Sequence, residues 1–251
     1  MVNLGSTFPL DTSSSFLLNY LPGGFSRDRR SDRKTMGDYQ HPLPAKQNHP
    51  VRVYQPQNRK GETMPKRINE KPVVYQLKVT LKNSKPPIWR RIQVAGDTSL
   101  AKLHWILQCV MEWTNSHLHQ FKVGREYYGE PMPEEDFDVE DERKITLAEA
   151  APGLKKKFIY EYDLGDGWEH EVVVEKILEP EPGVRYPFCV DGRRSRPPED
   201  CGGIWGYEEF LEAIRDPKHP EHDSMLEWIG GKFDAEEFHL DFVNQELKHL
   251  K

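Results

Sequence analysis

The sequence lacks the features that mark membrane-spanning, secreted and disulfide-stabilised proteins. No run of apolar residues approaches the roughly 18 that a membrane-spanning helix needs. Near the start only "FLLNYL" is apolar, without the basic region and cleavage site of a secretory signal. Cysteine is limited to Cys109, Cys189 and Cys201, with no C-x-x-C pair, which is typical of reduced thiols. These absences favour a cytoplasmic protein.

Charge divides the chain into two parts. Residues 1–72 hold 12 Lys and Arg against 6 Asp and Glu, net +6, and the rest holds 23 against 35, net −12. The first part also contains 8 of the 20 prolines. Such a composition buries too little apolar surface to offset the entropy of ordering, so we predict a disordered basic leader over 1–72. It is either a solvated tail or sequence upstream of a start at Met36 or Met64, although a basic arm could also contact nucleic acid.

From Val73 onward, alternating apolar and polar residues predict β-strands. "VVYQLKVTL" and "IWRRIQV" read as one hairpin, and "HLHQFKVGREYYG" alternates again. A second hairpin, "KKFIYEYDL" with "WEHEVVVEKIL", surrounds Gly165-Asp166-Gly167, whose glycines permit a tight turn. Between the first hairpin and these strands, Thr98 or Ser99 caps a predicted helix with an apolar stripe at three- and four-residue spacing.

The remainder predicts a long loop and then helices. Residues 180–206 are rich in proline and glycine, and unstructured loops of that length are often functional. Helices are expected over 207–215 and 225–229, and a last one starts at Asp234 with Glu237 completing a capping-box variant. Because the strands come as a group before the helices, we predict one α+β domain over 73–251 with a largely antiparallel sheet.

Five motifs in this order resemble one family. They are "PPIWRRIQV", "HLHQFKVGREYYG", "YDLGDGWEHEV", "YPFCVDGRRSRPPEDCGGIWGYEEFL" and "WIGGKFDAEEF". Together they span about 72–244 and resemble the Ri-plasmid open-reading-frame-three-like family, some of whose members are labelled transposon-passenger TnpR proteins. The resemblance implies an α+β fold and brings no settled biochemical activity.

The TnpR label suggests a site-specific recombinase, and the residues argue against that activity. A serine recombinase needs an activated serine near the start of its catalytic domain and clustered arginines for the phosphate. The matching region opens with a hairpin that lacks an Arg-x-Ser element, and it is net acidic, which disfavours approach to DNA. A DNA-associated accessory protein of a mobile element therefore stays as an alternative, without recombinase activity.

Four residues form a candidate metal site. His117 and His119 lie two positions apart on a predicted strand, so both imidazoles project from one face about 7 Å apart. With Asp166 and His170 they would suit zinc, manganese or magnesium, and a metal-bound water would make a metal-dependent hydrolase. In the simpler interpretation His119 or His170 is a core histidine that donates to a backbone carbonyl, and Asp166 only caps its turn.

The second candidate site is a binding surface around the 186–207 loop and the Asp166 turn. Its expected ligand contacts are aromatic and acidic: Trp168, Trp205, Tyr207, Glu199 and Asp200. Alternatively, Trp205 closes the core, and the two carboxylates pair with Arg90, Arg91 or the Arg193-Arg194 run. We favour a non-enzymatic binding or accessory module over a hydrolase, with a protein or small ligand as partner rather than nucleic acid or a membrane.

Overall fold

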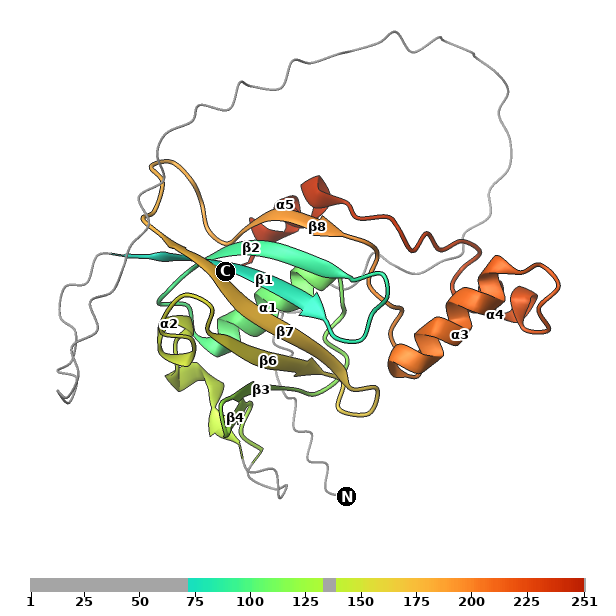
Figure 1. The fold of residues 1–251 in the computed structure, drawn as a ribbon, viewed down its shortest axis with the longest axis horizontal. Coiled ribbons are helices and arrows are strands. Elements are labelled where there is room, and N and C mark those ends of the chain that lie inside the picture. Colours follow the sequence, from blue (N-terminus) through green and yellow to red (C-terminus); the bar gives the residue numbers. More distant parts are fainter. Residues whose placement is uncertain (1–71, 133–138, 251) are drawn as a thin grey trace, which may run out of the picture. The chain divides into compact units, whose positions relative to one another are not determined.

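The structure is a computed structural model that describes residues 72–132 and 139–250, and an eight-stranded sheet is its central element (Figure 1). The strand order is β5-β4-β3-β6-β7-β1-β2-β8. Neighbours are antiparallel except β4 and β5, which are parallel. The strands are β1 (Val74–Leu81), β2 (Trp89–Ala95), β3 (His119–Val123), β4 (Glu126–Gly129), β5 (Glu140–Asp141), β6 (Lys157–Tyr162), β7 (Trp168–Leu178) and β8 (Phe188–Arg193). The α+β class with a mostly antiparallel sheet is therefore confirmed.

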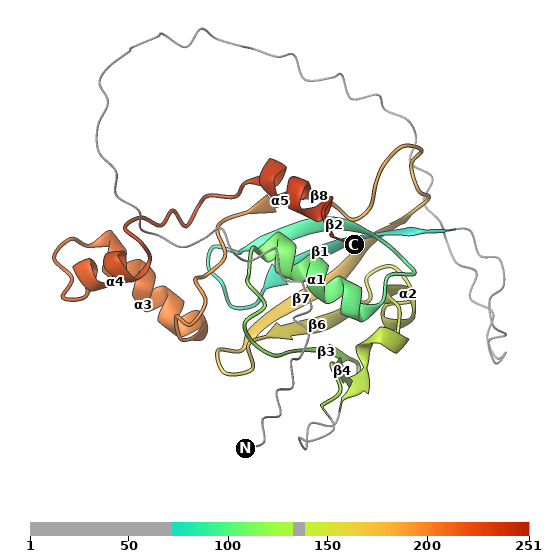
Figure 2. The same ribbon diagram turned by 180° about the vertical axis from the view of Figure 1, so that it is seen from behind.

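Helices lie on one face of this sheet and beside it. Figure 2 shows α1 and α2 over one face, whereas α3 packs against α4 beside the sheet and α5 packs against β8 and α1. The helices are α1 (Leu100–Met111), the 3₁₀ helix η1 (Glu142–Lys144), α2 (Leu147–Ala150), α3 (Gly203–Arg215), α4 (His222–Trp228) and α5 (Leu240–Leu247). Among the described residues no helix is long and apolar enough to cross a membrane.

The alternation read from the sequence decides which side chains meet α1. In β7 every second side chain is buried, namely Trp168, His170, Val172 and Val174, and the residues between them are partly exposed. The predicted stripe of α1 is buried as well, and the Ser99 hydroxyl accepts the Lys102 N–H as the helix cap. The core therefore lies between the sheet and α1, because strand period two and helix period 3.6 each present one apolar face.

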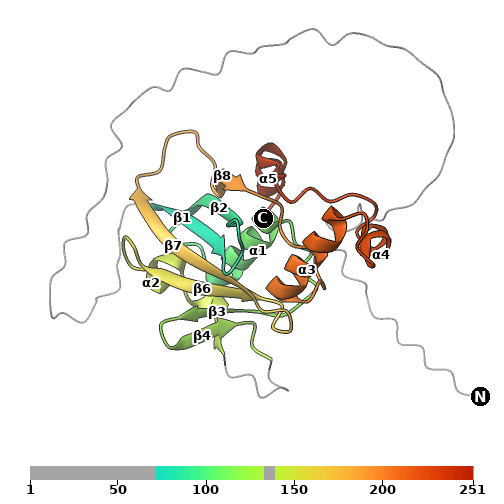
Figure 3. The same ribbon diagram turned by 45° about the vertical axis from the view of Figure 1, so that its right-hand side comes forward.

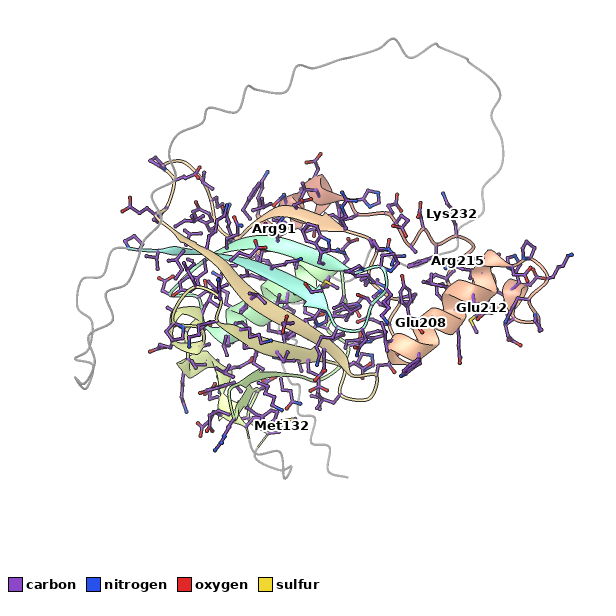
Figure 4. All side chains as sticks on the ribbon, in the orientation of Figure 1. Arg91, Met132, Glu208, Glu212, Arg215 and Lys232 are labelled. Carbon is purple, nitrogen blue, oxygen red and sulfur yellow. The ribbon has the colours of Figure 1, made fainter. Side chains whose placement is uncertain are left out.

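The opposite face of the sheet carries paired polar side chains. Arg91, labelled in Figure 4, donates two hydrogen bonds to Glu175 at 2.6 and 2.9 Å, and Gln76 donates a third at 3.0 Å. The prediction that Arg91 pairs with Glu199 or Asp200 is wrong, because its partners lie within the sheet.

Arg90 lies on the other side of β2 and is fully buried. It donates to the carbonyls of Val110 at 2.8 Å and Arg193 at 2.9 Å, and its guanidinium lies 4.0 Å from the ring centre of Phe238. Burial lowers its pKa to about 10, and nearby Glu112 opposes that shift. Arg90 thus ties the end of α1 to β8 and is not an ion-pair partner of Glu199 or Asp200.

The region predicted as one long loop contains an edge strand. β8 pairs with β2 within 180–206, and α5 covers its outer edge. The Asn244 side chain accepts the Cys189 N–H and donates to the Cys189 carbonyl, both at 2.8 Å. The sequence does not indicate this strand, because backbone groups on its outer edge bond to the side chain of Asn244, which lies 55 positions later.

Three helix starts also differ from the prediction, among them that of α4, which begins at His222 rather than Met225. The last helix begins at Leu240 rather than Asp234, because Asp234 forms a local turn in which its carboxylate accepts the Glu236 N–H. α3 begins at Gly203, so Trp205 lies in the first turn of a helix and not in a loop. The predicted leader, apart from Pro72, lies outside the described residues.

Candidate functional site

The turn between β6 and β7 is organised by Asp163. Its Oδ1 accepts the N–H groups of Gly165 at 3.0 Å and Asp166 at 3.2 Å, and its carbonyl accepts the Gly167 N–H. The Asp163 side chain therefore caps the turn, whereas the simpler interpretation assigned that role to Asp166. Its second oxygen, Oδ2, lies 3.6 Å from Nδ1 of His117, in the segment before β3.

Glu199 anchors the segment that leads into α3. Its carboxylate accepts hydrogen bonds from the Tyr162 hydroxyl at 2.6 Å and from the backbone and hydroxyl of Thr114. The same Tyr162 oxygen accepts the Ser116 N–H at 2.9 Å. Burial, followed by the bond to Glu199 and its charge, raises the pKa of Tyr162 well above its usual value. Glu199 therefore joins three segments, and no local sequence pattern indicates Thr114 or Tyr162 as its partners.

The neighbouring Asp200 meets His117. Oδ1 of Asp200 lies 3.1 Å from Nε2 of His117, and its side chain is 72% exposed. Nε2 itself is buried and forms no hydrogen bond with any described residue, because the carboxylate approaches it outside hydrogen-bonding geometry. His117, Asp163 and Asp200 each offer one potential ligand atom within 4.8 Å of the others. We call these three residues the His117 cluster.

A second contact joins the turn to α3. Oδ2 of Asp166 accepts the Gly202 N–H at 3.1 Å. Gly203 has φ +69°, and a Cβ there would lie 2.5 Å from the Asp166 carbonyl, so only glycine fits. Figure 3 shows α3 beginning beside the turn between β6 and β7. The Asp166 turn is thus in direct contact with the glycines that follow the acidic segment.

A hollow of about 520 Å³ opens where these segments meet. Trp205 stands at it with 75% of its surface exposed. We call it the Trp205 hollow; its lining is Leu81, Lys82, Asn83, Gly165, Asp166, Gly167, Trp168, Glu169, Gly202, Gly203, Ile204 and Trp205. Of the other predicted aromatic contacts, Trp168 borders the hollow with a side chain that is only 1% exposed, and Tyr207 is buried in the core at 3%.

The second histidine of the predicted metal site has different partners. Nε2 of His119 lies 2.9 Å from Oε2 of Glu142, and the His119 ring stacks on His104 with centroids 3.5 Å apart. His104 bonds to the Tyr160 hydroxyl and to Asn115, and burial, with His119 second, lowers its pKa to about 3. A cavity of about 650 Å³ borders this pair and also reaches His117; Met132, labelled in Figure 4, is another of its lining residues.

His170 is a core residue. It is fully buried, with Nδ1 3.3 Å from the Tyr160 carbonyl and Trp113 packed edge-on at 5.1 Å. The four predicted ligands therefore do not converge: His117 faces Asp163 and Asp200, His119 faces Glu142, Asp166 binds Gly202, and His170 lies in the core. The sequence could not reveal this, because these partners come from distant segments.

The three thiols are poorly suited to nucleophilic catalysis. All are unpaired, and burial raises the pKa of Cys109 and Cys201 to about 12 and that of Cys189 to about 11. A cysteine nucleophile needs a lowered pKa to form its thiolate near neutral pH.

Known proteins share the sequence that builds this region. A family model described as "plasmid pRiA4b ORF-3-like protein" matches residues 73–242. The chain belongs to the plasmid pRiA4b ORF-3-like family. It is 38% identical over 179 residues to the uncharacterized protein y4hQ of Sinorhizobium fredii (strain NBRC 101917 / NGR234), across 70% of this chain and 92% of that protein.

A solved relative agrees with the fold. The crystal structure of MM3350, a protein of unknown function from Methanosarcina mazei Go1, matches with a TM-score of 0.63 and 38% identity. The match covers 68% of this chain and 98% of that chain. These two relatives are themselves described as uncharacterized or of unknown function.

Proposed function

We propose that the protein is a binding module that receives a segment of a partner protein in the Trp205 hollow. The observation that carries this proposal is the 75% exposure of Trp205 beside a hollow of about 520 Å³. Tryptophan is enriched among the residues that dominate protein–protein affinity, and an indole left in water gains roughly 2–3 kcal/mol when a partner buries it.

The surroundings of the indole favour an extended peptide as the occupant. Four glycines line the hollow, so a second backbone can approach closely without meeting side chains. At its border Lys82 and Glu169 form an ion pair at 2.5 Å whose side chains are 40% and 39% exposed, and they offer polar groups that can orient a partner. Such a mixed apolar and polar site is typical of small protein interfaces.

Charge argues against nucleic acid as the partner. Residues 73–251 carry 23 basic and 35 acidic side chains, net −12, which repels a phosphate backbone. The three unpaired thiols support a cytoplasmic location for this interaction.

The test compares Trp205→Ala with Trp228→Ala, a matched control at an exposed tryptophan (48%) outside the hollow. Proteins that co-purify with each tagged variant are quantified by mass spectrometry, and the pair is rebuilt from purified components. We expect one partner whose affinity falls at least about tenfold with Trp205→Ala and is unchanged with Trp228→Ala. Equal retention of the partner by the parent protein and both variants would contradict a peptide-binding function. So would a small molecule that native mass spectrometry finds bound to the parent and not to Trp205→Ala.

A metal-dependent hydrolase is the second candidate, and the His117 cluster is the observation that favours it. One imidazole and two carboxylates lie within 4.8 Å, and a cation held by three side chains keeps a position for a reactive water. Hydrolysis of bis(p-nitrophenyl) phosphate with and without Mn²⁺ tests it. We expect hydrolysis that depends on Mn²⁺ and that His117→Ala abolishes. A rate that is the same without Mn²⁺, or the same in His117→Ala, would eliminate the hydrolase.

A further inference from the structure

Three segments far apart in the chain deliver the donor atoms of the His117 cluster. His117 precedes β3, Asp163 follows β6, and Asp200 precedes α3. Two of these positions are held by contacts outside the cluster: Asp163 by its turn, and Asp200 by the bonds of the adjacent Glu199 to Tyr162 and Thr114. The donors are thus brought together by the fold and not by local sequence.

The separation of the two better-buried donors suits one ion. Nδ1 of His117 and Oδ2 of Asp163 are 3.6 Å apart. Two ligands about 2.1 Å from a tetrahedral ion lie about 3.4 Å from each other. Because Oδ1 of Asp163 accepts the turn hydrogen bonds, its Oδ2 remains for an ion. The Asp200 side chain is 72% exposed, so its carboxylate can rotate to become the third ligand.

The other imidazole nitrogen has no hydrogen-bond partner of its own among the described residues. Nε2 of His117 is buried without a hydrogen bond to any described residue, although Asp200 lies beside it. Buried polar atoms are almost always paired, so an unpaired one calls for an explanation. An ion on Nδ1 leaves the proton on Nε2, and a small rotation of the exposed Asp200 carboxylate, 3.1 Å away, would let one of its oxygens accept that proton's hydrogen bond.

We propose that His117, Asp163 and Asp200 bind one divalent cation of the Mn²⁺ or Zn²⁺ type, with water in the remaining positions. One imidazole nitrogen with two carboxylate oxygens suits these ions better than Ca²⁺, which takes six to eight oxygen ligands. The site is independent of the Trp205 hollow and of its proposed partner, and it requires no catalytic activity.

The experiment uses the full chain, purified without a tag and treated with a chelator. Mn²⁺ binding is followed by electron paramagnetic resonance, and Zn²⁺ binding by calorimetry. We expect one ion per chain, at least tenfold weaker binding in His117→Ala and Asp163→Asn, and unchanged binding in His119→Gln and Asp166→Asn. The two controls change a histidine and an aspartate close to the cluster but outside it. The proposal would be overturned if the parent protein bound neither ion at concentrations up to about millimolar, or if His119→Gln and Asp166→Asn lost as much affinity as the cluster variants.

Loss of folding is separated from loss of ligand by two measurements. Asn at position 163 keeps an oxygen that can accept the turn hydrogen bonds, and Asp200→Asn changes an exposed side chain. Both variants should therefore melt near the parent temperature without metal, and they should lose the rise in melting temperature that metal gives the parent. A parent protein whose melting temperature does not respond to saturating metal would count against the site. Absence of phosphodiester hydrolysis would remove the hydrolase alone.

Discussion

Mild acid should destabilise the folded state through His170. Full burial, with Arg90 as a smaller repulsive contribution, lowers the pKa of this imidazole from 6.5 to about 4. In the unfolded chain the pKa returns to about 6.5, so the unfolded state binds more protons between pH 6.5 and pH 4. The stabilisation by neutral His170 is therefore complete above pH 6.5 and is lost as the pH falls toward 4.

The size of the effect follows from the two pKa values. Between pH 7 and pH 5 a shift from 6.5 to about 4 removes about 2 kcal/mol of unfolding free energy. His104, whose pKa is lowered to about 3, removes a similar amount over the same interval, about 2 kcal/mol. Replacing one of the two imidazoles should thus halve the histidine part of the pH dependence.

The contribution of His170 to this pH dependence is measured by urea unfolding of the parent and of His170→Asn, each at pH 7 and pH 5. The substitution lowers stability at both pH values because it alters packing, but that cost cancels in the difference between them. The parent should lose about 2 kcal/mol more on acidification than the variant. If both proteins lose the same amount, His170 does not remain neutral in the folded state, and the reasoning is refuted.

Further substitutions test the contacts that hold the site, all by urea unfolding at pH 7. Gly206→Ala should cost more than about 2 kcal/mol, because its Cβ would lie 1.8 Å from the Cys201 carbonyl; an unchanged midpoint would contradict this packing. Tyr162→Phe removes the hydroxyl that donates to Glu199 and should cost about 1–2 kcal/mol. Arg90→Met should cost about 3 kcal/mol, because it leaves the Val110 and Arg193 carbonyls without this donor, and unchanged stability would contradict the role of the guanidinium.

The regular elements could be read from the sequence because their signals are local. The strand alternation in β7, the Ser99 cap of α1 and the glycine turn around Asp166 depend on neighbours within a few residues. β8 was missed because its pairing depends on β2 and on Asn244.

The candidate site was decided almost entirely by tertiary structure. The sequence by itself determined that Gly165, Asp166 and Gly167 would form a tight turn between two strands, because glycine and aspartate favour turns. Only the fold decided that His117 faces Asp163 and Asp200, that His119 faces Glu142, and that His170 is buried. The physical reason is that a side chain's partners depend on strand order and register, which bring together residues whose separation along the chain carries no local signal.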